Sequence, residues 1–220
     1  TSQRSKELHK SASDLITVIK DPIKFINTNT PNIQMLGWEQ LTTSQLRDTQ
    51  IPLIINAATK AISEIVSKRA IARKALSTVL TLTERGVFDQ TNVDDFVDKL
   101  MNCLEEKDAT IGGVAQKILL TFVTRTHLDP VVNCCIRTLQ LTYSHTMKLQ
   151  LLEILSTVIH NETVARKCLM VVGKGCIDKD LEVNREATKI LRRIAELVGW
   201  DYIKQRSEER RVGKECRSRW

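Results

Sequence analysis

The side chains in this sequence that could carry catalytic chemistry do not stand in a pattern that any reaction uses. The four histidines, at positions 9, 127, 145 and 160, are not spaced from Ser, Asp or Cys as in a nucleophilic or metal site. No glycine-rich phosphate-binding loop is predicted, because Gly112-Gly113 stands at the start of an expected helix and Gly173-Lys174-Gly175 lacks the preceding strand that such a loop requires. We therefore predict no enzyme activity, and no cofactor, metal or small-molecule substrate.

The cysteines indicate a reducing compartment rather than a metal site. Outside residues 206–220 there are five, with no C-x-x-C pair and no Cys/His set at zinc spacing. The adjacent pair Cys134-Cys135 would point in different directions on a helix, which disfavours chelation. We predict that these cysteines are small buried hydrophobes of a cytoplasmic protein.

Basic residues recur at positions where we expect the chain to turn between helices. They are Lys68, Arg69, Lys107, Lys148, Lys179 and Arg185. One interpretation is that Lys and Arg occupy turns only because turns are hydrated. The other is an intermittent basic ridge for an acidic partner surface, which would accelerate association and make binding sensitive to salt.

The elements that would position this ridge are helices of a regular repeat. An apolar residue is followed four positions later by a small or apolar residue, and four later by another apolar one. The five copies are Ile33-Gly37-Leu41, Ile71-Ala75-Val79, Ile111-Ala115-Leu119, Met147-Leu151-Leu155 and Val183-Ala187-Leu191, with shifts of 38, 40, 36 and 36 residues. This length and helical spacing predict stacked helix pairs, each covering the apolar face of its neighbours.

The fold class that follows is all-α, an α-solenoid of about five antiparallel helix pairs. Leu82, Phe122, Val158 and Ile194 extend four of the copies to an i, i+4, i+8, i+11 stripe, which is the buried face of a helix. Pro and Asp residues at expected helix starts predict a helix over 13–19, followed by five helix pairs. The pairs are 22–26 with 31–47, 52–66 with 68–85, 94–104 with 108–124, 129–141 with 146–159, and 164–172 with 180–198. We expect Gly173 to Gly175 to interrupt the last pair.

The two ends of the chain are expected to differ from this solenoid, which we place at 13–205. Residues 1–12 are polar and predicted to be a flexible segment. Residues 206–220, RSEERRVGKECRSRW, resemble the translation of a common short-read sequencing adapter, and we interpret them as an artefactual tail. Because the chain starts at Thr1 rather than Met, we expect it to be a fragment of a longer protein.

Overall charge and hydropathy narrow the choice of partners. The net charge is +7 but falls to +4 without residues 206–220, so the sequence permits an acidic partner without requiring nucleic acid, which we do not expect. No run reaches the roughly 18 apolar residues that a membrane span needs. We therefore expect neither a membrane nor a nucleic-acid partner.

Three segments of the chain resemble HEAT repeats. They are Ser67 to Leu76 (SKRAIARKAL), Lys107 to Ala115 (KDATIGGVA) and Asp180 to Ala187 (DLEVNREA). More narrowly, the second of them is similar to the central repeat of TOG domains, as in the CLASP and crescerin families of microtubule regulators. The similarity covers about residues 13 to 200.

The resemblance implies a non-catalytic module that binds tubulin or microtubules through the turns within each repeat. By position it would make the six basic residues the candidate contacts, and it implies a cytoplasmic, cytoskeletal protein, with a cilium as one location. The chain departs from the family at the first turn, where Asn29-Thr30-Pro31-Asn32 replaces the usual Trp, and we expect Trp38 to pack in the core. The alternative is a generic HEAT or armadillo scaffold in trafficking or signalling.

Overall fold

The structure is a computed structural model that describes residues 21–206, and within this range every regular element is a helix. The predicted segment 1–12, the predicted helix 13–19 and residues 207–220 of the expected tail lie outside the described residues. Contacts divide the chain into two compact units, Thr1–Val131 and Val132–Trp220, which we call unit 1 and unit 2. The division falls within helix α8 (Leu128–Leu141).

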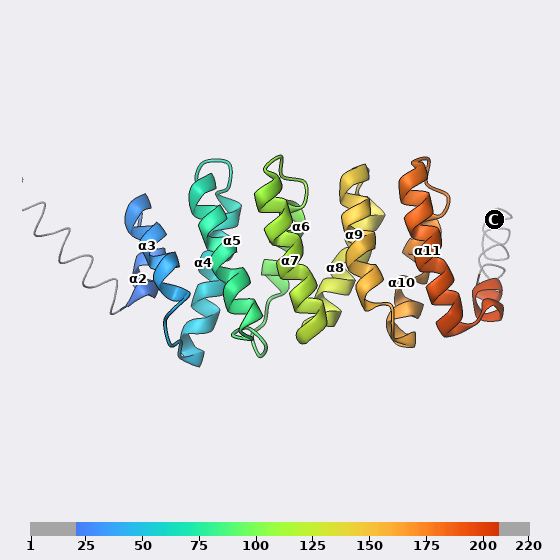
Figure 1. The fold of residues 1–220 in the computed structure, drawn as a ribbon, viewed down its shortest axis with the longest axis horizontal. Coiled ribbons are helices and arrows are strands. Elements are labelled where there is room, and N and C mark those ends of the chain that lie inside the picture. The colour runs from blue at the N-terminus through green and yellow to red at the C-terminus, as the bar shows by residue number, and fades with distance from the viewer. Residues whose placement is uncertain (1–20, 207–220) are drawn as a thin grey trace, which may run out of the picture. The chain divides into compact units, whose positions relative to one another are not determined.

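Unit 1 consists of short helices joined by turns. They are α2 (Pro22–Ile26), α3 (Pro31–Leu41), the 3-10 helix η1 (Asp48–Gln50), α4 (Ile51–Ser63), α5 (Arg69–Glu84), α6 (Asp94–Cys103) and α7 (Ala109–Arg125). The pairs α2/α3, α4/α5 and α6/α7 each pack together, so neighbours in sequence are also neighbours in space. The first helices α2, α4 and α6 contact one another in one layer, and the second helices α3, α5 and α7 do so in the other (Figure 1).

Unit 2 repeats this arrangement with fewer helices. It contains the greater part of α8, then α9 (His145–Val158), α10 (Glu162–Gly175) and α11 (Leu181–Val198), and residues 200–206 are again helical. Helix α11 packs against both α9 and α10 (Figure 1). Side chains cap three of these helices: Ser144 accepts from the Met147 amide, Asn161 from Thr163, and Asp180 from Glu182 and Val183.

The five sequence signatures all fall on the second helix of a pair (α3, α5, α7, α9 and α11), and most of their side chains lie in the core. On α5, Ala75 and Val79 are fully buried, and on α7 the same is true of Ala115 and Leu119. The predicted fourth positions are also buried: Leu82, Phe122, Val158 and Ile194. The predicted stripe is therefore confirmed except at Ile33 and Leu191, which are only partly buried. The burial of Trp38 is also confirmed, and its carbonyl accepts a hydrogen bond from Thr78 Oγ1 at 2.9 Å.

Two predicted helix ends were wrong. Helix α3 ends at Leu41 rather than near residue 47, because the hydroxyls of Thr42, Thr43 and Ser44 bond to carbonyls of its last turn. The segment Gly173 to Gly175 does not interrupt α10 but forms its end. A Cβ at Gly175 would lie 2.8 Å from Ala187 Cβ, so this glycine lets α10 and α11 approach closely.

Gly37 has the same role in the first pair. A Cβ at this position would lie 3.0 Å from the Ile26 amide nitrogen and 3.1 Å from the Pro22 carbonyl oxygen. Both are backbone atoms of α2, which cannot rotate away as a side chain could. The small residue in this signature therefore sets the distance between α2 and α3.

We expect Gly37→Ala to lower the free energy of unfolding by about 1–3 kcal/mol, because the added methyl overpacks this contact. The matched control is Gly113→Ala on α7, where a Cβ would have no neighbour within 4 Å. Removing that partly buried helical glycine should raise the free energy of unfolding by about 0.5–1 kcal/mol. Urea denaturation followed by circular dichroism measures both changes, and a Gly37→Ala protein as stable as the parent would contradict the proposed contact.

Candidate protein-binding edge at the helix turns

In unit 1 the turns within successive helix pairs lie next to each other. The α4–α5 turn and the α6–α7 turn, with the residues that follow them, form what we call the unit 1 turn edge (64–73 and 104–110). An ion pair between Arg73 Nη2 and Asp108 Oδ2 joins the two. Asp108 also caps α7 by accepting from the Thr110 amide at 3.1 Å. The hydrogen bond from Arg73 lowers the pKa of Asp108, so the carboxylate stays ionised.

In unit 2 the turns before α9 and α11 are joined in the same way. We call these residues the unit 2 turn edge (142–148 and 176–185). His145 Nδ1 lies 2.7 Å from Asp180 Oδ2, and its Nε2 lies 3.5 Å from Glu182 Oε2. Lys148 Nζ donates to Asp178 Oδ2 at 2.6 Å, and this hydrogen bond lowers the pKa of Asp178. The contacts of His145 and Lys148 therefore hold the two turns of unit 2 against each other.

Three of the six predicted contact residues are engaged in ion pairs within their own unit. Lys68 Nζ lies 2.7 Å from Glu64 Oε2, one helical turn earlier. Lys148 binds Asp178 as described, and both side chains are about four-fifths buried. Arg185 Nε lies 3.5 Å from Glu186 Oε1. These cations shape the edge, but their charge is largely compensated locally.

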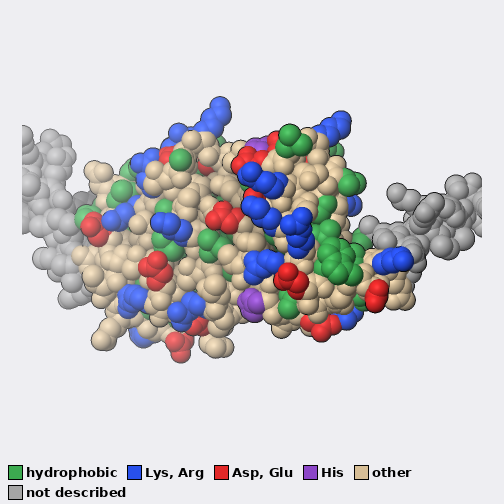
Figure 2. Space-filling model, turned by 45° about the vertical axis from the view of Figure 1, so that its right-hand side comes forward, with side chains coloured by type: hydrophobic (Ala, Val, Ile, Leu, Met, Phe, Trp, Pro, Cys, Tyr) green, Lys and Arg blue, Asp and Glu red, His purple; other side chains and the backbone are tan. Residues whose placement is uncertain are grey.

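The other three predicted residues, Arg69, Lys107 and Lys179, are exposed and form no ion pair with any described residue. They are not surrounded by positive charge alone, because Glu105 and Glu106 share the turn with Lys107. Figure 2 shows basic and acidic side chains interspersed over the visible face. The turns therefore present isolated cations among mixed charges rather than a continuous basic ridge.

A second feature of the turns was not predicted from the sequence. Among the large apolar side chains of residues 21–206, four are more than four-fifths exposed: Val66 (88%), Tyr143 (96%), Ile177 (82%) and Leu181 (85%). Val66 lies in the α4–α5 turn, Tyr143 in the α8–α9 turn, and Ile177 in the α10–α11 turn, with Leu181 opening α11. Every one of them thus belongs to a turn within a helix pair.

A signal for these residues was present in the sequence. Each stands in or beside a polar turn and out of phase with the buried stripe of the following helix, as Leu181 does relative to Val183 and Ala187. Such residues do not fit the helical periodicity from which the buried stripe is predicted. Three of the four, Tyr143, Ile177 and Leu181, share the unit 2 turn edge. Contiguous exposed apolar patches are typical of surfaces that bind partners.

The histidines and cysteines hold no site in the described part of the chain. His127 is buried, with its Nε2 2.8 Å from the Phe88 carbonyl oxygen. Burial raises the pKa of Cys103 to about 12 and of Cys168 to about 11, so these thiols are unreactive core groups. Residues 21–206 contain no group of three or more His, Cys, Asp or Glu side chains arranged for a metal ion. None of the helices there combines the length and apolar composition that crossing a membrane requires.

The comparisons with known proteins do not assign this chain to a family. No protein-family model and no curated protein matches this sequence. Among solved structures, the chain is similar to the crystal structure of an engineered protein, with 16% sequence identity, a TM-score of 0.47, and coverage of 89% of this chain and 85% of that one. A likeness of this size carries no argument about fold or function.

The Lys148–Asp178 pair predicts a pH dependence of stability. Because the pKa of Asp178 is lower in the folded chain than in the unfolded one, its contribution is complete above an unfolded pKa of about 3.9 and is lost as pH falls through the folded value. At pH 7, Asp178→Asn should cost about 1 kcal/mol, which lowers Tm by roughly 2–4 °C. The difference from the parent should shrink as the pH is lowered below 4.

Thermal unfolding followed by circular dichroism at a series of pH values checks this expectation. Asp201→Asn, which removes an exposed carboxylate in the same unit, is the matched control and should change Tm little at any pH. An Asp178→Asn deficit that persists unchanged at acid pH would show that the ion pair is not its cause.

Proposed function

We propose that this chain is a protein-binding module of the HEAT and TOG kind, a solenoid of about five antiparallel helix pairs that docks its intra-pair turns onto an acidic protein surface. The first candidate partner is tubulin. The module would act by binding alone, as part of a larger cytoplasmic regulator of the cytoskeleton.

The observation that carries this proposal is the position of the four most exposed apolar side chains. A protein gains nothing in stability from holding a Tyr or Ile in solvent, yet Tyr143, Ile177 and Leu181 all lie on the unit 2 turn edge, and Val66 lies on the unit 1 turn edge. On docking, each would be buried against the partner, and a few such side chains supply most of the affinity of an ordinary interface.

The uncompensated cations supply the preference for an acidic partner. Arg69 lies close in sequence to Val66 on unit 1, and Lys179 lies between Ile177 and Leu181 on unit 2. Lys107 lies on the neighbouring turn of unit 1. Surface charges of this kind raise the association rate and select the partner more than they raise the final affinity. Because they are solvated, their effect should weaken as salt is added.

The ion pairs between turns would prepare the edge for binding. The Arg73–Asp108 pair in unit 1 and the Lys148–Asp178 pair in unit 2 each connect residues from different helix pairs. They fix the turns relative to one another before a partner arrives. A surface held in its bound arrangement loses less conformational entropy on association.

The proposal takes into account that the first turn differs from that of TOG domains. The α2–α3 turn is polar around the exposed residue Asn29, so it offers no aromatic contact. The exposed aromatic residue of the described turns is Tyr143 on unit 2. If tubulin is the partner, this module would therefore rely more on its later turns than TOG domains do.

We expect the double charge reversal Arg69→Glu/Lys107→Glu to weaken tubulin binding at low salt about tenfold or more, because it replaces two uncompensated cations of the unit 1 turn edge with repulsive charges. The control Lys117→Glu/Arg192→Glu makes the same change in net charge at exposed cations on the bodies of α7 and α11. That control should bind within about twofold of the parent.

Sedimentation velocity with purified tubulin measures these affinities. Equal weakening by both double variants would indicate a non-specific charge effect instead of docking at the turns. A parent chain that sediments free of tubulin at low salt would remove tubulin as the partner.

The apolar part of the edge makes a separate prediction. Ile177→Ser and Leu181→Ser should each weaken binding of the partner about fivefold or more, while changing the free energy of unfolding by less than about 0.5 kcal/mol because both side chains are already exposed. Leu53→Ser, at a half-exposed position on α4 away from the turns, should leave the affinity unchanged. Unaltered affinity in both Ile177→Ser and Leu181→Ser would exclude the unit 2 turn edge from the interface.

A further inference from the structure

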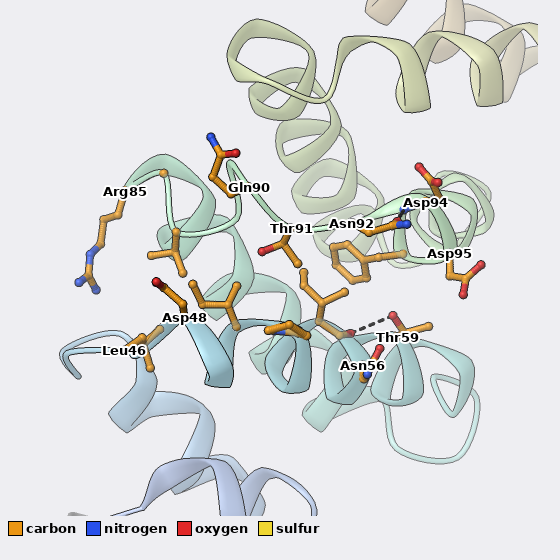
Figure 3. Close-up of a pocket in the computed structure, with 16 residues that line it drawn as sticks. Leu46, Asp48, Asn56, Thr59, Arg85, Gln90, Thr91, Asn92, Asp94 and Asp95 are labelled. Carbon is orange, nitrogen blue, oxygen red and sulfur yellow. Dashed lines mark hydrogen bonds between the residues drawn. The ribbon is translucent and has the colours of Figure 1, made fainter.

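A hollow of about 1000 Å³ lies in unit 1, away from the turns within the helix pairs. It is bounded by α4, by the start of α6 and by the segment 85–93 that connects α5 to α6 (Figure 3). Its apolar lining comes from Ile51, Ile55, Val87 and Phe96. The hollow is open to solvent, so its shape suits an extended chain lying along it better than an enclosed small molecule.

Polar side chains with free hydrogen-bonding groups border this apolar lining. Asn56 on α4 and Gln90 and Thr91 in the connecting segment line the hollow, and their side chains form no hydrogen bond with other described residues (Figure 3). An amide carries both donor and acceptor groups, as a peptide backbone does. Asn56 and Gln90 can therefore each pair with one peptide unit of a bound segment.

The charge of the hollow is negative at the end formed by α6. Asp94 and Asp95 stand there in the first turn of the helix, where carboxylates also favour the helix dipole. Asp48 lies at the other end, close to Arg85 (Figure 3). Arg85 donates from Nη1 to the Thr42 carbonyl at 2.7 Å, whereas none of the three aspartates forms an ion pair within residues 21–206.

From these features we infer that the hollow binds an extended peptide segment in which apolar and basic side chains alternate. Alternate residues of an extended chain point to opposite sides, so apolar side chains can reach the partly exposed Ile51 and Val87 while a Lys or Arg faces Asp94 and Asp95. The amides of Asn56 and Gln90 would hold the backbone. The carboxylates disfavour the phosphates of a nucleic acid, which leaves a basic peptide as the complementary occupant.

Two pools of fluorescein-labelled peptides of about eight residues test this inference, a length that spans about 26 Å when extended. Both pools carry varied apolar residues at alternate positions. Arg occupies the remaining central positions in one pool and Glu in the other. Fluorescence anisotropy with the full chain should show the Arg pool binding at least about tenfold more tightly than the Glu pool.

Two variants test the location of the site. Asn56→Trp fills the hollow from an exposed position on α4 without changing the charge, and should lower the affinity for the Arg pool about tenfold. Asp94→Asn/Asp95→Asn should lower it about fivefold. The matched control Glu105→Gln/Glu106→Gln removes two carboxylates just beyond the other end of α6 and should bind as the parent does.

The inference is overturned if neither pool binds, if both bind equally, or if Asn56→Trp binds the Arg pool as tightly as the parent. It stands apart from the proposed docking of the turns. The Arg69→Glu/Lys107→Glu variant should bind the Arg peptide pool as tightly as the parent does, and Asn56→Trp should bind tubulin as tightly as the parent does.

Discussion

The close packing of the second helices is the constraint on which the rest of the structure depends. Helix α5 contacts α3, α4 and α7, and its Ala75 is fully buried at the centre of these contacts. A larger residue there would push the helices apart, and a polar one would lose its hydration without gaining a partner. Such a helix keeps only its ends and one outer face accessible, as the exposed Arg73 and Ser77 of α5 show. The surfaces free to meet a partner are therefore the turns and the outer faces of the two helix layers.

The polar contacts of the structure follow from the same packing. Once the helices are held at a fixed separation, the turn of one pair comes within reach of the next, and Arg73 can bind Asp108 across 35 residues of sequence. The same holds for Lys148 and Asp178, which are 30 residues apart. Water screens the Arg73–Asp108 pair more than the Lys148–Asp178 pair, because the Arg73 side chain is half exposed, and neither pair is expected to add more than about 1 kcal/mol. Their effect is on the surface: they compensate some cations of the turns and leave a few others, such as Arg69, uncompensated.

The difference between contacts that are local in sequence and contacts between helix pairs explains what the sequence could and could not predict. Most positions of the stripes and the buried Trp38 were predicted because each depends on residues within a few turns of helix. The compensation of Lys148 depends on a residue from another helix pair, so no local pattern reveals it. Gly175 shows the same limit for backbone structure. The low helix propensity of glycine predicts that the helix is interrupted here. In the structure Gly175 is the last residue of α10, and its lack of a side chain allows α10 to approach Ala187 of α11 closely.

The two proposed binding surfaces can act independently for a geometric reason. Both involve α4, which carries the hollow near Ile51 and Ile55 and leads at its other end into the turn that holds Lys68. A helix of 13 residues is about 20 Å long, about twice the screening length of roughly 8–10 Å at physiological salt. A charge at one end is thus weakly felt at the other. Within the same unit, an acidic hollow and turns with free cations can therefore select partners of opposite charge without cancelling each other.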